Sequence, residues 1–109
     1  MAFDFFAEDH NGNFYQNPIC VAFSVTTTSG GAFSANITDA ALTHIRSISA
    51  QCLNTASGVT NTTVTSITGF STTSVTGNVY QFTSTLGVLN LAAAGSGRTV
   101  YITIIGDQA

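Results

Sequence analysis

The stretch that decides the fold class is Thr-Val-Tyr-Ile-Thr-Ile-Ile at residues 99–105. It consists of β-branched and aromatic residues, which favour strands. Successive positions are apolar, so both faces of such a strand carry apolar side chains, which is typical of a strand in the middle of a sheet. We therefore predict a central strand over Thr99–Ile105, entered from a turn at Gly95-Ser96-Gly97.

Other strands are predicted at regular distances before this one. Ile19–Thr28 alternates apolar and polar residues, and Ser29-Gly30-Gly31 follows it as a turn. Residues 54–85 are rich in Thr and Ser and end in a strand at Val79–Thr85, and Leu86–Leu91 is a further candidate. Short strands with a turn signal every eight to twelve residues predict a mainly β fold, a small β-sandwich or barrel of about seven strands.

One short helix is predicted at residues 38–46. Apolar residues recur there at intervals of three and four, which is the spacing of one helix face. Thr38 suits the N-cap and Asp39 the first turn, where the helix dipole favours an acid. From Ile48 onward the apolar residues alternate instead, so a strand is the alternative for the second half.

The first sixteen residues differ from the rest of the single domain that we expect over residues 1–109. They hold five aromatic residues and three of the five acids. Asn11-Gly12 favours a type I′ turn, so one interpretation is a β-hairpin packed on the core. The other is an arm that docks on a neighbouring subunit, because aromatic residues are enriched in interface cores. We predict these contact residues: Phe3, Phe5, Phe6, Phe14 and Tyr15.

Charged residues are scarce. They make up 6% of the chain, against about 25% in typical domains, and none of them is Lys. A surface made polar by Ser, Thr and Asn can be covered by a neighbour without stripping water from ions. This composition favours a subunit buried in an assembly, and a Thr-rich secreted monomer is the alternative. Two arginines cannot form the basic stripe that nucleic acid or an anionic membrane surface requires.

Residues for catalysis or metal binding are few. A hydrolase would have to use His44 with Cys52 or a serine, but no serine lies in a Gly-x-Ser-x-Gly turn. Zinc would need His10, His44, Cys20 and Cys52, which lack the usual paired spacing. Asp9, Asn11 and Asn13 match only the start of a calcium loop. We expect no enzymatic activity, no cofactor and no metal.

The two cysteines and the N-terminus bear on the compartment. The opening residues are acidic and lack the basic and apolar regions of a signal peptide, so we expect synthesis in the cytoplasm. In that compartment Cys20 and Cys52 are expected as buried free thiols. A disulfide between them is the alternative for an extracellular protein.

In overall character the chain resembles the small decoration, or cement, proteins and other minor structural proteins of tailed-phage virions. The likeness lies in its length, its Gly/Ser/Thr/Ala-rich β body, the aromatic opening and the apolar strand Thr99–Ile105 before a short polar tail. The resemblance implies oligomers, often trimers, seated on a lattice of a major coat protein, and therefore a location in the virion. The scarcity of charge departs from this family and fits a buried structural position as well as an outer one. An extracellular adhesive or lectin-like subunit is the alternative function.

Overall fold

The computed structural model describes residues 18–108. These residues form seven β-strands. Three-residue 3₁₀ turns lie at Ser29–Gly31, Thr38–Ala40 and Val59–Asn61. The strands are β1 (Pro18–Thr26), β2 (Ala32–Asn36), β3 (Leu42–Cys52), β4 (Thr63–Phe70), β5 (Ser74–Thr85), β6 (Val88–Ala93) and β7 (Thr99–Gln108).

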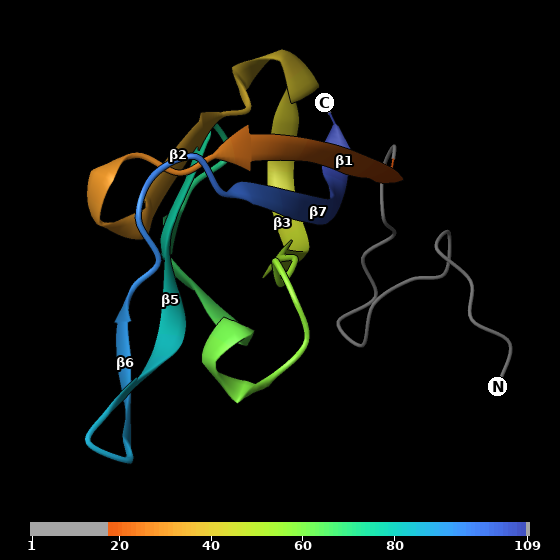
Figure 1. Cartoon of the computed structure of the whole chain (residues 1–109). Helices are drawn as coiled ribbons and strands as arrows, with labels where there is room; N and C mark the ends of the chain where they lie inside the picture. The colour runs from red at the N-terminus through yellow and green to blue at the C-terminus, as the bar shows by residue number, and fades with distance from the viewer. Residues whose placement is uncertain (1–17, 109) are drawn as a thin grey trace, which may run out of the picture.

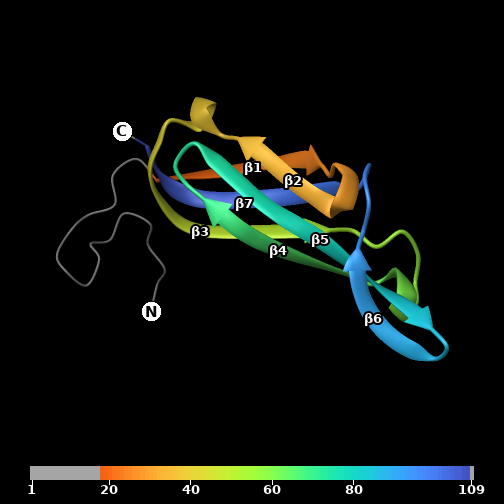
Figure 2. The same ribbon diagram turned by 90° about the vertical axis from the view of Figure 1, so that its left-hand side faces the viewer.

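The strands pair into two antiparallel sheets that pack face to face (Figure 1). One sheet has the order β1-β7-β3, and the other has the order β2-β5-β4 with β6 also paired to β5. Figure 2 looks onto the second, four-stranded sheet with the three-stranded sheet behind it. The prediction of a small, mainly β sandwich of about seven strands is confirmed.

The strand β7 is the centre of the three-stranded sheet, as predicted. It pairs with β1 on one side and with β3 on the other. Its alternate residues Val100, Ile102 and Ile104 are fully buried against the second sheet. The opposite face is more open, because no second layer formed by residues 18–108 covers it, and Tyr101 is 51% exposed there.

The core lies between β7 and β5. Val75 and Val79 of β5 are fully buried, and they form one cluster with the buried face of β7. Phe33 of β2 completes this cluster from the edge of the four-stranded sheet. Burying a Val, Ile or Phe side chain stabilises a fold by about 1.5–3 kcal/mol, so these few residues account for much of the cohesion between the sheets.

The helix predicted at residues 38–46 is wrong. Thr38–Ala40 is only one 3₁₀ turn, Ala41 has a left-handed backbone with φ 53°, and β3 begins at Leu42. The pairing of β3 with β7 contains two register shifts, one between Leu42 and His44 and one between Ile45 and Ser47. Each β-bulge adds one residue to the strand. Inward-facing residues thus recur every three positions, a spacing that imitates a helix.

A β-hairpin of β5 and β6 extends beyond the sandwich at one end (Figures 1 and 2). The turn is Leu86-Gly87, and both residues have positive φ, as a type I′ turn requires. Leu86 therefore belongs to the turn, and the strand expected from Leu86 begins at Val88. β4 pairs with β5 only as far as Gln81. Beyond Gln81, β5 pairs with β6 alone among the described strands.

The two cysteines are both free thiols. Cys52 is buried in the core cluster, as expected. Cys20 is exposed on β1, so its expected burial is wrong. In β1 the inward residues are Ile19, Val21, Phe23 and Val25, and the alternation places Cys20 on the opposite face.

Candidate functional site

The five aromatic residues predicted to make contacts lie outside the described residues 18–108. They are Phe3, Phe5, Phe6, Phe14 and Tyr15. The Asn11-Gly12 turn and the candidate calcium ligands also fall in this segment.

The structure separates the side chains that a hydrolase or zinc site would need. His44 and Cys52 belong to the same strand, β3, eight residues apart, so roughly 26 Å separates them at the rise of a strand. Cys20 lies on β1, on the far side of β7. No group of three His, Cys, Asp or Glu residues that could hold a metal ion is found among residues 18–108.

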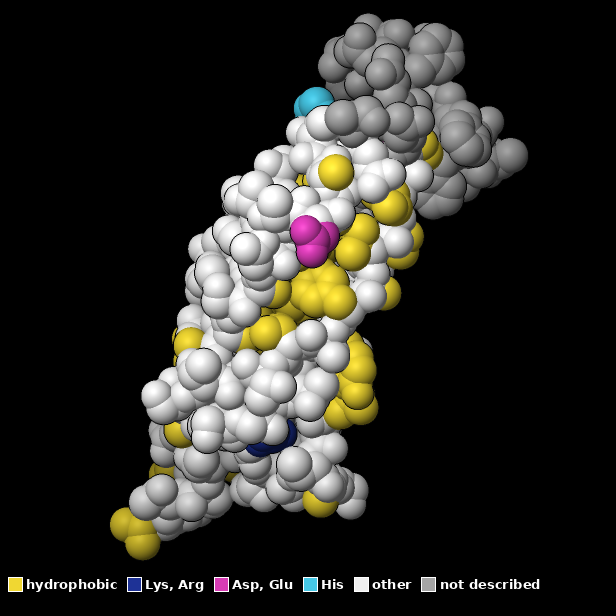
Figure 3. All heavy atoms as spheres, turned by 90° about the horizontal axis from the view of Figure 1, so that it is seen from above, with side chains coloured by type: hydrophobic (Ala, Val, Ile, Leu, Met, Phe, Trp, Pro, Cys, Tyr) yellow, Lys and Arg dark blue, Asp and Glu magenta, His cyan; other side chains and the backbone are white. Residues whose placement is uncertain are grey.

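Charged side chains are confined to one part of the sandwich. No residue from Ser47 to Gly97 carries a charge, and neither does β2, so every strand of the four-stranded sheet is uncharged. The charges of the described residues lie on β3, β7 and the loops around them. Figure 3 shows the result on one face of the molecule, where white and yellow surface predominates and charged groups are few.

The two arginines are held by the fold itself. Arg46 contacts the carboxylate of Asp107 through Nη2 at 2.8 Å and Nε at 3.0 Å, and only 6% of that aspartate side chain is exposed. Arg98 donates from Nη1 to Oε1 of Gln81 at 2.6 Å. Both guanidinium groups thus form hydrogen bonds with other side chains of the same chain.

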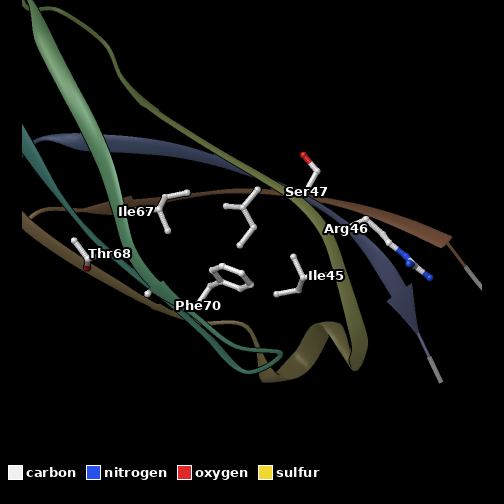
Figure 4. Close-up of a pocket in the computed structure, with 8 residues that line it drawn as sticks. Ile45, Arg46, Ser47, Ile67, Thr68 and Phe70 are labelled. Atoms are coloured by element: carbon white, nitrogen blue, oxygen red, sulfur yellow. The ribbon is translucent and has the colours of Figure 1, made fainter.

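An apolar groove of about 570 Å³ opens between β3 and β4, the edge strands of the two sheets. Ile45 of β3 and Ile67 and Phe70 of β4 point into it (Figure 4), and Ile48 completes the apolar lining. Phe70 is 62% exposed. Arg46, Ser47 and Thr68 also line the groove, but in Figure 4 their side chains point away from the apolar ones. The apolar side chains between the strands therefore suit an aliphatic or aromatic side chain.

A second candidate surface is the hairpin of β5 and β6. All six residues of β6 are exposed, and Leu86 at the turn is 100% exposed. Natural proteins usually protect such an edge with Lys, Pro or a bulge, and none of these is present in β6. The alternating apolar residues on both sides of Leu86-Gly87 would have predicted this hairpin from the sequence.

Comparisons with known proteins give no family for this chain: no family model, curated protein or solved structure matches it. Within residues 18–108, no helix has the length and apolar character needed to cross a membrane. The distinctive surfaces of the described residues are the groove between β3 and β4, the uncharged four-stranded sheet and the exposed β5–β6 hairpin.

Proposed function

We propose that this chain is a non-enzymatic structural protein that associates with copies of itself and docks on a larger protein lattice, such as the capsid or tail of a virion. The observation that carries the proposal is the four-stranded sheet without a single charged side chain. Covering it with another protein removes no ion from water, so the interface avoids the large desolvation cost of buried charges. The mass of the purified chain in solution tests the self-association.

The groove between β3 and β4 is where we place the contact of the aromatic N-terminal segment on a neighbouring copy. Ile45, Ile48, Ile67 and Phe70 offer an apolar lining that matches aromatic side chains. Ile19 near the start of β1 and Ile45 in the groove lie on either side of Gly106 of β7, with which both pair. The start of β1 is therefore about two strand spacings, roughly 10 Å, from the groove. Residues 1–17 can span up to about 55 Å when extended, which is enough to reach a neighbour.

Removing residues 1–16 is expected to weaken association while the sandwich stays folded. The described core cluster is built from residues 33–104, so we expect it to hold without the deleted segment. Thermal unfolding followed by circular dichroism, together with sedimentation of both chains, measures the two effects separately. If the shortened chain unfolds, the aromatic segment belongs to its own core and the proposed docking role is wrong.

A glycan-binding adhesive module is the second candidate function. Tyr101 is half exposed on the outer face of β7, between Ser24 of β1 and Gln51 of β3. An exposed aromatic ring flanked by hydroxyl and amide groups suits stacking on a sugar. Binding to a glycan array that is lost in Tyr101→Ala would favour this function over a structural one.

A further inference from the structure

The outer face of the β5–β6 hairpin is apolar. In an antiparallel pair, residues opposite each other point to the same face. Tyr80 lies opposite both Val64 and Ala93, and Phe82 lies opposite Leu91. Val79 is fully buried, so its neighbour Tyr80 faces away from the core. One outward-facing cluster therefore contains Val64, Tyr80, Phe82, Leu89, Leu91 and Ala93.

The opposite face of the same hairpin is mainly polar. Thr83 lies opposite Asn90, and Gln81 lies opposite Ala92. Gln81 also binds Arg98 and the carbonyl oxygen of Thr60, so this face is turned toward the rest of the sandwich. Ser84 on the apolar face and Val88 on the polar face are exceptions, but the predominant alternation is the pattern of a sheet with one face buried. In this hairpin both faces of β6 are exposed, and the apolar face, with Leu89 and Leu91 about half exposed, has no covering layer among residues 18–108.

We propose that two copies of the chain pack through this outer face, with the β5–β6 hairpin of each lying on the four-stranded sheet of the other. The proposal rests on the self-association proposed above and names its surface. A two-fold contact uses the same patch on both subunits, so each apolar cluster covers its counterpart.

Charge favours a second copy as the partner. Around a two-fold axis a patch meets its own copy, so charged residues close to the axis, or a patch that carries one sign of charge, would repel themselves. The four-stranded sheet avoids this repulsion because none of its strands carries a charge. A partner with a charged surface would find no complementary group on these strands.

The area of the sheet is of the order that a stable dimer needs. β5 has 12 residues, which corresponds to about 40 Å, and three strand positions side by side span about 14 Å. The flat footprint is therefore roughly 560 Å², and accessible surface exceeds it because side chains project from the sheet. A standard interface buries about 800 Å² on each partner.

Leu86 adds an independent indication. It has φ 52° and is completely exposed at the hairpin turn, a position where Asn is the preferred residue. A leucine there strains the backbone and exposes apolar surface in the isolated chain. Contact with a second copy would bury that side chain, so the dimer explains a residue that the monomer does not.

The test compares Leu91→Lys with Asn90→Lys, adjacent residues on opposite faces of β6. Analytical ultracentrifugation over a concentration series gives the dissociation constant of each variant and of the unmodified chain. Leu91→Lys is expected to weaken association at least about tenfold, because its charge would be buried without a partner. Asn90→Lys is expected to change it much less. Equal weakening by both, or by neither, would overturn the outer-face contact while leaving self-association standing.

Leu86→Asn keeps the proposal testable if Leu91→Lys folds poorly. It should raise the melting temperature by about 2–6 °C by relieving the strained turn, yet weaken association. Unchanged association with a higher melting temperature would contradict the role given to Leu86. An unmodified chain that stays monomeric throughout would instead overturn the self-association itself, and with it this surface.

Discussion

Gly77→Ala is expected to lower the free energy of unfolding by about 3 kcal/mol, because the site has no room for a methyl group. A Cβ at Gly77 would overlap both the backbone oxygen of Ser66 on β4 and the ring of Phe33 on β2. Neither neighbour can move easily, since the first belongs to the sheet ladder and the second is buried in the core. Urea unfolding followed by circular dichroism measures the change.

Asn78→Ala is the matched control for Gly77→Ala. Asn78 is the next residue of β5 and is half-buried on the outer face of the sheet. Its replacement is expected to change the free energy of unfolding by no more than about 0.5 kcal/mol, as is usual away from the core. Comparable losses in both variants would contradict the tight packing described around Gly77.

Arg46→Ala is expected to destabilise the fold by about 2 kcal/mol, less than a fully buried ion pair that loses one partner, because only the Asp107 side of the pair is buried. The carboxylate of Asp107 is almost completely covered, and Arg46 contacts it through two nitrogens. Without the guanidinium group, a charge would remain in a poorly solvated site. The partial exposure of Arg46 lets some water in, which limits the loss.

Arg98→Ala and a double variant serve as controls for this prediction. Arg98 pairs with the neutral Gln81, so its loss is expected to cost only about 1 kcal/mol. Arg46→Ala combined with Asp107→Asn should recover part of the stability, because a neutral amide costs less to bury than a carboxylate. If Arg46→Ala is no more damaging than Arg98→Ala, the ion pair is not an important support of the sheet.

The strands could be predicted from the sequence wherever the local pattern is simple. Thr99–Ile105 is a nearly continuous β-branched and aromatic run, and Ile19–Thr28 alternates apolar and polar residues; both belong to strands of the three-stranded sheet. The pattern failed at β3, where two bulges shift the inward residues to a spacing of three. Those bulges depend on the partner strand β7, which is distant in the sequence.

The candidate surfaces were harder to predict from the sequence than the strands. The groove brings Ile45 and Ile48 of β3 beside Ile67 and Phe70 of β4, and only the stacking of two sheets creates that neighbourhood. The charge-poor composition was visible, but its concentration in one sheet depends on how the strands pair. The aromatic segment, chosen for its composition, remains a prediction because it lies outside the described residues.

The mass of the purified full chain in solution tests the central claim of assembly through an uncharged surface most directly. Light scattering would cover a concentration range of about a hundredfold, at low and at high salt. We expect a multiple of the 11.3 kDa chain mass that does not fall as salt is added, because an interface without ions has nothing to screen. A monomer of 11.3 kDa at every concentration, or an oligomer that dissociates in high salt, would contradict the claim.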